Sequence, residues 1–336
     1  MITPGLVDLQ VNGYAGHDVN ADDVSIDTLA ALTRALWEQG VTTYLPTVIT
    51  ASEEKILHVL AVIAAARRSD PLLAHSIAGI HVEGPSIAAE DGPRGAHDAR
   101  HLRDPDPAEL ERWQHAADGA LRILTLAPER PGAVAYIRAA TARGIRASVG
   151  HCAPTPQQIR EAADAGASLS THLGNGTHQL LPRHPNHLWA QLAEDRLTAM
   201  LIADGHHLPA DALTVMIRAK GMHRCVLTSD SAALAGMPPG RYDTPVGGEV
   251  EVGEDGRLQL AGSTLLAGSG ASLRDCLRWA TRHLPVPPEQ LLLMASRTPA
   301  ALLGIQERAD EGGDTVRWEG DRIAEVTVAG EVVHGD

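Results

Sequence analysis

Short apolar segments alternate with amphipathic segments along most of the chain. The apolar segments are rich in Val, Leu and Ile, as strands are, and they cover residues 6–12, 41–49, 76–83, 121–127, 146–151, 168–173, 198–204 and 224–230. The segments between them have helical periodicity, several opened by Pro, Ser or Thr and closed by Gly, and they cover residues 26–39, 52–68, 107–117, 131–143, 156–165 and 209–220. This alternation predicts parallel strands joined by helical crossovers.

Eight strand–helix units in a chain of 336 residues favour a (β/α)8 barrel over an open doubly wound sheet. The hydrophobic fraction, 44%, is large enough for one full core. No G-x-G-x-x-G sequence follows the first strand, so the dinucleotide-binding alternative loses its main support. We therefore expect an α/β protein built on a TIM-type barrel.

The pattern changes after the eighth predicted strand. The segment "GEVEVGEDGRLQLAG", residues 248–262, predicts a hairpin that turns at residues 254–256. Two helices are expected within 271–303, and the tail from Asp314 to Val333 alternates like a small antiparallel sheet. These segments predict a small β appendage to the barrel.

Polar side chains stand at the carboxyl ends of the predicted strands, where barrels of this kind have their active sites. They are Gln10 and Asn12 on the first strand, His81 and Glu83 on the third, His151 on the fifth, His172 on the sixth, Asp204 on the seventh and Asp230 on the eighth. Because side chains alternate with a period of two, Gln10 shares a face with Asn12, and His81 shares one with Glu83. A single residue of this kind is more often structural, so the prediction depends on their joint occurrence.

Together these residues suit metal-assisted hydrolysis. The carboxylate of Glu83 and the imidazoles of His151 and His172 form a mixed N/O set that suits a divalent ion such as zinc. A metal lowers the pKa of a bound water, and Asp230 is placed to accept the proton. The sequence therefore predicts a hydrolase.

Composition narrows the alternatives. The formal net charge of −14 is spread along the chain without a Lys/Arg-rich patch, which argues against a nucleic-acid partner. The first residues carry no signal-peptide pattern, and the longest apolar window is too short to cross a bilayer, so we expect no membrane association and a cytoplasmic protein. Three cysteines without C-x-x-C spacing argue against a disulfide framework and a thiolate metal site.

Seven segments appear in the order of the amidohydrolase superfamily, and they closely resemble the N-acetylglucosamine-6-phosphate deacetylase family over about residues 4–304. They read "PGLVDLQVNG", "HVEGPSIA", "RGAHD", "SVGHCAPTPQQIREAADAGASLSTHLGNG", "IADGHHLPADAL", "LTSDSAALAG" and "LAGSGASL". The resemblance implies that Glu83, His151 and His172 hold the metal and that Asp230 is the catalytic residue.

The first strand departs from the His-x-His pair with which many amidohydrolases begin. Gln10 and Asn12 stand there, and neutral amides are weak ligands of transition metals. The weak ligand strength of the two amides and the family resemblance thus both predict one divalent ion per subunit. Zinc is the first choice, and iron, cobalt and manganese are alternatives. For Gln10 and Asn12 themselves, a hydrogen-bonded strand end and a direct contact with substrate remain equally open.

The resemblance also implies a set of substrate contacts. Those contacts fall on Ala96, His97, Asn175, Gly176, His207, Ala267, Gly268 and Ser269. The family's phosphate-binding arginine reaches in from the neighbouring subunit and aligns with Arg183, which implies a homodimer. For Arg183 an ordinary exposed loop charge is the competing interpretation.

Two segments depart from the family. Gly174-Asn175-Gly176-Thr177 replaces the usual aromatic residue, Asn, Ala and Met, and the loop at 178–189 also differs, which leaves acyl and sugar specificity open. The family's small domain pairs an N-terminal β segment with C-terminal strands. We expect a barrel over 1–304 and, over 305–336, a remnant of that domain whose N-terminal half is absent or reduced.

The expected activity is that of a metal-dependent deacetylase of an N-acetyl amino sugar, with N-acetylglucosamine 6-phosphate as the expected substrate and the free amine and acetate as products. Other amidohydrolase reactions on the same metal site stay open, namely hydrolysis of an N-acyl amino acid or a cyclic amide, or deacetylation of an unphosphorylated sugar. A non-catalytic sugar-phosphate sensor is disfavoured, because a binding protein needs no general base.

Overall fold

The protein is built around a barrel of parallel strands, in the computed structural model that describes residues 1–244, 248–263, 265–310 and 312–335. An eight-stranded sheet follows the chain order from first strand to last. Its members are β2 (Leu6–Val11), β5 (Val41–Ile49), β6 (Ile80–Glu83), β7 (Leu121–Leu126), β8 (Arg146–Val149), β9 (Leu169–Ser170), β10 (Thr198–Ile202) and β11 (Cys225–Thr228). A parallel bridge between Val11 and Ser231 brings the two edges together. The predicted fold class is confirmed.

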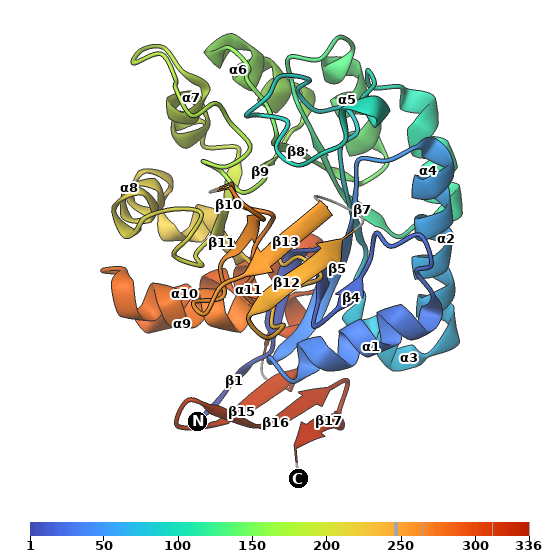
Figure 1. The fold of residues 1–336 in the computed structure, drawn as a ribbon, viewed down its shortest axis with the longest axis vertical. Helices are drawn as coiled ribbons and strands as arrows, with labels where there is room; N and C mark the ends of the chain where they lie inside the picture. The colour runs from blue at the N-terminus through green and yellow to red at the C-terminus, as the bar shows by residue number, and fades with distance from the viewer. Residues whose placement is uncertain (245–247, 264, 311, 336) are drawn as a thin grey trace.

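Helices surround the barrel (Figure 1). They are α1 (Ile26–Trp37), α2 (Glu53–Ser69), α3 (Pro71–Ser76), α4 (Pro107–Ala116), α5 (Ala133–Ala142), α6 (Pro156–Ala165), α7 (His187–Ala193), α8 (Ala210–Lys220), α9 (Leu273–His283), α10 (Pro288–Met294) and α11 (Arg297–Leu303). Side chains of Ser25, Thr155 and Ser272 cap α1, α6 and α9 in reciprocal capping boxes. These polar starts are the signals by which the sequence predicts the helices.

The structure corrects the prediction for the barrel strands and the helices in three places. The strand expected over 76–83 begins only at Ile80, because Asp70 caps a short helix with Pro71 at its first position. Helix α7 was not predicted. The two helices expected within 271–303 are three, and Pro288 lies at the start of the second.

The barrel interior holds an apolar layer and, above it, a polar layer. The apolar layer consists of inward-facing residues from alternate positions, closed below by α11, and comprises Val7, Leu9, Leu45, Ile123, Leu169, Met200, Val226 and Ala300. Above it, Thr125 Oγ1 lies 2.7 Å from His81 Nε2 and 2.6 Å from Thr171 Oγ1. The hydrogen bonds explain how His81 is buried completely, and they place it beneath the strand ends as a structural residue.

Two small sheets flank the barrel. One joins β1 (Ile2–Pro4) to β15 (Thr315–Glu319), β16 (Arg322–Val328) and β17 (Glu331–Gly335), and it packs on Trp37 of α1. The expected C-terminal sheet therefore forms, and a strand from the chain's start, which was not predicted, is part of it. Residues 311 and 336 of the predicted 305–336 segment lie outside the described residues.

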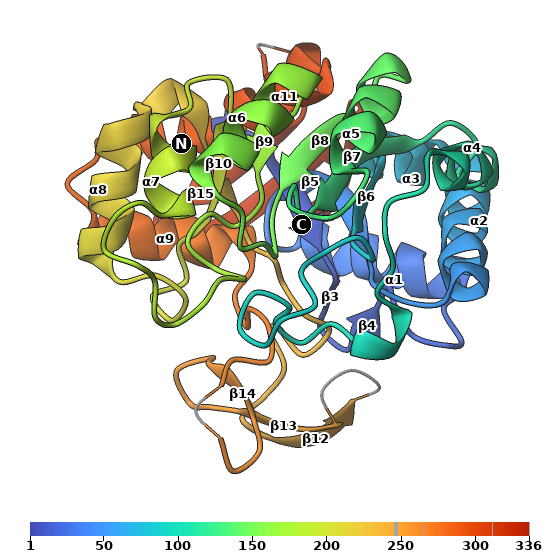
Figure 2. The same ribbon diagram turned by 90° about the horizontal axis from the view of Figure 1, so that it is seen from above.

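The second small sheet stands over the carboxyl ends of the barrel strands, apart from the barrel wall (Figure 2). It consists of β12 (Gly240–Thr244), β13 (Gly248–Val252) and β14 (Leu258–Leu260). The predicted hairpin corresponds to β13 and β14, and β12 was not predicted. Strands β3 (Gly13–Tyr14) and β4 (His17–Asp18) form a minor hairpin after β2.

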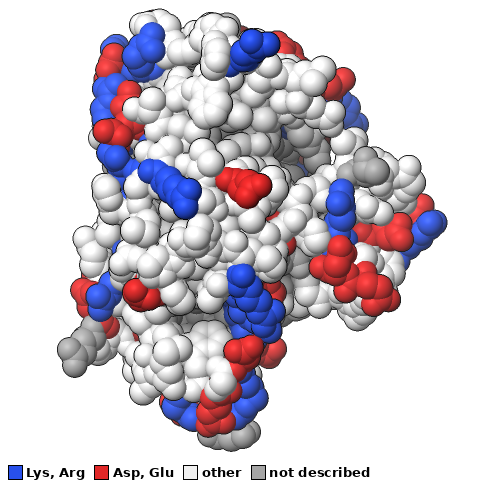
Figure 3. All heavy atoms as spheres, turned by 90° about the vertical axis from the view of Figure 1, so that its left-hand side faces the viewer, with Lys and Arg blue, Asp and Glu red and all other residues white. Residues whose placement is uncertain are grey.

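The surface carries mixed charge. On the face shown in Figure 3, Lys and Arg are interspersed with Asp and Glu. Ion pairs between such side chains occur elsewhere in the described residues too, for example between Arg196 and Asp164 at 2.6 Å. No helix within the described ranges is long and apolar enough to span a membrane.

Candidate metal and active site

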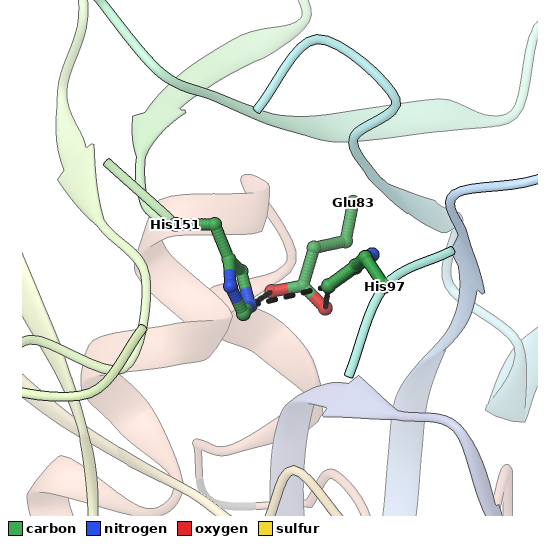
Figure 4. Close-up of side chains that lie close together, drawn as sticks. All are labelled: Glu83, His97 and His151. Atoms are coloured by element: carbon green, nitrogen blue, oxygen red, sulfur yellow. Dashed lines mark hydrogen bonds and ion pairs between the residues drawn. The ribbon is translucent and has the colours of Figure 1, made fainter. Parts of the chain in front are cut away.

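Three imidazoles converge on the carboxylate of Glu83 at the end of β6. Glu83 Oε1 lies 3.0 Å from Nε2 of His172 and 3.5 Å from Nε2 of His151, and Glu83 Oε2 lies 3.8 Å from Nε2 of His97. His151 and His172 follow β8 and β9, whereas His97 comes from the loop after β6 and points toward the other two residues drawn in Figure 4. All four side chains are buried.

The ring nitrogens are oriented by contacts on their far sides. Nδ1 of His151 donates to the carbonyl oxygen of Pro93 at 2.9 Å, which leaves Nε2 as the ring nitrogen that faces Glu83. Nδ1 of His97 lies 2.8 Å from Thr50 Oγ1. Burial, followed by the positive charge of His151, lowers the pKa of His97 to about 3, so that this ring is a neutral ligand or hydrogen-bonding group.

This arrangement fits a divalent cation. The Nε2 atoms of His151 and His172 face each other at 3.0 Å, and those of His97 and His151 at 3.2 Å. Without a cation, one ring of each pair must donate a proton to the other, whereas a cation accepts a lone pair from every ring. Ligand atoms around a tetrahedral ion stand about 3.3 Å apart when each bond is about 2.0–2.1 Å long. The observed separations are close to that value.

Two overlapping ligand sets share Glu83 and His151. The predicted set adds His172, and its three ligand atoms are separated by 3.0, 3.0 and 3.5 Å. The other adds His97, and its ligand atoms lie within 4.8 Å of one another. The sequence prediction placed His97 among the substrate contacts and not among the metal ligands, since nothing in a G-A-H segment shows that its loop folds back over the strand ends.

Glu83 is ionised. Burial by itself raises its pKa, but the charges and hydrogen bonds of His151 and His172 outweigh burial and hold the pKa well below the usual value. The same interaction acts on His172, where burial lowers the pKa, the hydrogen bond and charge of Glu83 raise it, and the net shift is upward. A carboxylate ionised at neutral pH is the form that binds a metal ion.

The backbone at the strand ends is strained at three of these positions. His151, His172 and Asp230 have φ values of 47°, 29° and 50°, in the left-handed region that residues with a Cβ rarely adopt. At each position the chain leaves a barrel strand and turns the side chain toward the centre of the mouth. The strain is concentrated where the polar side chains converge.

Asp230 follows β11 and lies across the barrel mouth from Glu83. Gln10 of β2 and Asn12, just after β2, contact the carboxylates of Glu83 and Asp230. Asn12 Nδ2 donates to Asp230 Oδ1 at 2.8 Å, and Gln10 Nε2 donates to Glu83 Oε1 at 3.0 Å. Burial, followed by the negative charge of Glu83, raises the pKa of Asp230 to about 6. The strand alternation predicted from the sequence thus brings Gln10 and Asn12 to the site as hydrogen-bond donors.

His207 is held by Asp204, which follows β10. Asp204 Oδ2 accepts from Nδ1 of His207 at 2.7 Å, while Oδ1 accepts from the backbone N–H groups of His206 and His207, each at 2.9 Å. Burial raises the pKa of Asp204, but these bonds outweigh burial and lower it to about 2. The ring of His207 is therefore oriented by an ionised carboxylate.

A cavity of about 780 Å³ opens above these groups. The predicted site residues that line it are Asn12, Glu83, Ala96, His97, His151, His172, Asn175, Gly176, His207, Asp230, Ala267 and Gly268. Three others do not line it: Gln10 and Ser269 are buried behind the wall, and Arg183 is exposed on the loop before α7. The single chain therefore does not bring Arg183 to the site.

The cavity also has walls that sequence reasoning missed. Asp18 and Asn20 line one side, and Arg257 lines another from the turn between β13 and β14. Asp18 stands within the short β4 strand and Arg257 in a hairpin turn, so neither follows a barrel strand. A search confined to strand ends could not find them.

Comparison with known proteins shows the family of the chain. Residues 1–311 match the amidohydrolase family. The chain is 36% identical to N-acetylglucosamine-6-phosphate deacetylase of Vibrio furnissii over 307 residues, which are 91% of this chain and 75% of that protein. It is 35% identical to N-acetylgalactosamine-6-phosphate deacetylase of Escherichia coli O157:H7, covering 91% of this chain and 78% of that protein.

Solved structures of such deacetylases have a fold similar to that of this chain. N-acetyl-D-glucosamine-6-phosphate deacetylase of Mycobacterium smegmatis superposes with a TM-score of 0.89 at 32% identity, covering 99% of this chain and 88% of that one. A mutant of that enzyme in complex with N-acetyl-D-glucosamine-6-phosphate gives a TM-score of 0.87, with 99% and 86% covered. The corresponding enzyme of Thermotoga maritima gives 0.88 at 28% identity, covering 100% and 89%.

Proposed function

The chain belongs to the amidohydrolase family, and we propose from that premise that it deacetylates a 6-phosphorylated N-acetyl amino sugar, with N-acetylglucosamine 6-phosphate first. Water cleaves the amide C–N bond and gives acetate and the free amine. The observation that carries the proposal is the convergence of Glu83, His151 and His172 with Asp230 opposite. Relatives named for this reaction over nine-tenths of the chain support it.

The metal assignment rests on the donor set. Glu83, His151 and His172 are proposed to hold one divalent ion, with zinc as the first choice and His97 beside it. When bound, such an ion supplies Lewis acidity that polarises the amide carbonyl and lowers the pKa of a water. The chain's own contribution is a buried, ionised carboxylate and two buried imidazoles, of which His151 is oriented through Nδ1 by the carbonyl oxygen of Pro93.

Asp230 is proposed as the general base and then the general acid. Its carboxylate takes a proton from the attacking water and returns it to the leaving nitrogen, which must be protonated to depart. Asn12 orients it through the bond to Oδ1. One group can perform both transfers because the water and the nitrogen attach to the same carbon.

The other lining residues are proposed to hold the sugar and the carbonyl. His97 and His207 are the candidates for stabilising the developing oxyanion, since both line the cavity and both are oriented through Nδ1. Ala96, Asn175, Gly176, Ala267 and Gly268 are proposed to form the walls against the sugar, with Ser269 behind them. We also propose a homodimer, in which Arg183 of a second copy reaches the phosphate, and a cytoplasmic location.

A panel of N-acetyl compounds tests the proposal. Acetate release would be measured with the 6-phosphates of N-acetylglucosamine and N-acetylgalactosamine, with unphosphorylated N-acetylglucosamine and with an N-acyl amino acid. We expect the highest kcat/KM for a 6-phosphate, and loss of turnover in Asp230→Asn. Turnover of the N-acyl amino acid alone, or of none of the four compounds, would contradict the proposal.

A further inference from the structure

A phosphorylated substrate poses a charge problem in this cavity. Glu83, Asp230 and Asp18 line it, the proposed divalent ion would balance two of these charges, and a sugar 6-phosphate brings close to two more negative charges. Burying an anion among carboxylates is unfavourable unless a cation faces it. Among the described residues that line the cavity, Arg257 is the one lysine or arginine.

The backbone of Arg257 has a defined place in the hairpin. It is the last residue of the turn that connects β13 to β14. Its carbonyl oxygen accepts from the N–H of Gly253 at 2.9 Å, and its own N–H donates to Asp255 Oδ1 at 3.2 Å. The side chain is half-buried at the cavity wall, whereas Asp255 and Glu254 are exposed.

The β13–β14 hairpin contacts segments that follow barrel strands, so the position of Arg257 is fixed relative to the site. Leu258 and Val250 are buried against Leu234, which follows β11. The N–H of Ala267 donates to the carbonyl oxygen of Leu258 at 3.1 Å, and His206 Nε2 lies 3.3 Å from the carbonyl oxygen of Asp255. The turn therefore lies beside two other walls of the cavity, the segment with His207 and the segment with Gly268.

We propose that Arg257 is a phosphate-binding residue of this site, contributed by the same chain that holds the metal ligands. The inference rests on the proposed function. It names the residue that would make the protein prefer a phosphorylated sugar to an unphosphorylated one. A guanidinium offers a planar fork of N–H donors that matches two phosphate oxygens. Arg183, by contrast, is exposed and lies outside the cavity of its own chain.

The arrangement suits the shape of the substrate. In a 2-acetamido sugar 6-phosphate, the amide and the phosphate lie at different ends of the ring. The proposed metal ligands and Asp230 stand at the ends of barrel strands, and Arg257 lines the cavity from the turn between β13 and β14, two strands of the sheet that lies apart from the barrel in Figure 2. The amide can thus reach the strand ends while the phosphate meets the hairpin.

Substitution of Arg257 tests the proposal against both sugars. Arg257→Gln should lower kcat/KM for the 6-phosphate by about 10- to 100-fold, the loss expected for a charge-assisted contact, and should leave the unphosphorylated sugar within about twofold. Arg257→Lys should retain part of the preference. The matched control is Arg241→Gln on β12 of the same sheet, whose side chain is exposed and lies 3.5 Å from Glu249.

Calorimetry separates this inference from the proposed reaction. Binding of glucosamine 6-phosphate and of glucosamine would be measured on the metal-loaded wild type and on the same variants. We expect the wild type to bind the phosphorylated amine more tightly, and Arg257→Gln, but not Arg241→Gln, to remove most of the difference. This result would support Arg257 even if no acetate were released, an outcome that contradicts only the proposed reaction.

Three results would overturn the role of Arg257. One is equal binding of both amines by the wild type. Another is an equal loss on both sugars in Arg257→Gln, which would make the residue structural to the hairpin. The third is an unchanged preference in Arg257→Gln together with its loss in Arg183→Gln, which would assign the phosphate to the neighbouring subunit alone.

Discussion

The floor and the rim of the cavity are built in different ways. On the floor, Glu83, His151 and His172 leave barrel strands, are almost fully buried and contact one another. On the rim, the loop before α7 is exposed, with Leu180 91% exposed, and the β12–β14 sheet stands apart from the barrel wall. The proposed metal ligands are thus placed at the ends of barrel strands, and the groups proposed to select the substrate are placed on segments outside the barrel wall.

This difference indicates at which positions the roles implied by the family resemblance carry over to this chain. The strand-end residues are constrained by barrel geometry, because each strand delivers its last side chain to the same mouth. Loops between elements tolerate insertion and substitution, and they carry specificity. The departure at 178–189 falls on the rim, and the departure at 174–177 lies between the rim and the floor, just after His172. Changes on the floor should therefore remove activity, and changes on the rim should redistribute it among substrates.

The largest effect is expected from the metal ligands. His172→Ala and Glu83→Gln should reduce acetate release to background and lower the metal content from about one ion per chain, the stoichiometry of a single site with an open position. His97→Ala should retain the metal and lose turnover only. Elemental analysis of the three purified variants checks this.

That comparison also separates the two overlapping ligand sets. Metal lost from His97→Ala but kept in His172→Ala would assign the ion to His97 instead. About two ions per wild-type chain would mean that Gln10 and Asn12 do not mark a mononuclear site.

The next largest effect is expected at Asp230. Asp230→Asn keeps the side-chain volume but cannot accept a proton, so kcat should fall by a factor of about 10² to 10⁴. Metal content should remain that of the wild type, and substrate should still bind. Asp211→Asn, at the exposed start of α8, is the charge-matched control. Turnover near that of the wild type would transfer the proton role to another group.

A smaller effect is expected at Asp204, a positioning residue. Asp204→Asn weakens the bond that orients His207, and kcat/KM should fall by about 10-fold, the lower end of losses for groups that orient a functional histidine. If Asp204 acts through His207, the double variant with His207→Asn should lose little more than His207→Asn alone. Additive losses would show that Asp204 acts independently.

The smallest effect concerns stability beneath the rim. Burial, followed by the charge of His178, lowers the pKa of His187 to about 4, and His187 Nε2 lies 3.0 Å from Thr177 Oγ1. The unfolded chain binds this proton near pH 6.5, so the contribution to stability is complete above that pH and is lost as pH falls toward 4. The wild type should lose about 1–2 kcal/mol more than His187→Gln across this range.

Urea unfolding at several pH values measures the difference. His184→Gln, an exposed histidine on the loop just before α7, is the control. Parallel pH profiles for the wild type and His187→Gln would contradict the prediction.

The barrel was predictable because its signals are local. Each strand is a short apolar run, and helices such as α1 and α6 begin at capping side chains that the sequence displays. The strands predicted at 41–49 and 121–127 correspond closely to β5 and β7. The strand expected from residue 76 begins late because the helix started by Asp70 and Pro71 continues through Ser76, and the chain joins the sheet as β6 only at Ile80.

The sequence by itself determined the eight-unit barrel and the residue types at its strand ends, since periodicity and strand polarity are properties of neighbouring residues. Only the tertiary structure decided that the loop with His97 folds over Glu83, that Arg257 lines the cavity and that Arg183 does not. It alone also joined β1 to β15, more than 300 residues away. Such contacts depend on packing between segments distant in the chain, and no local pattern of side chains encodes them.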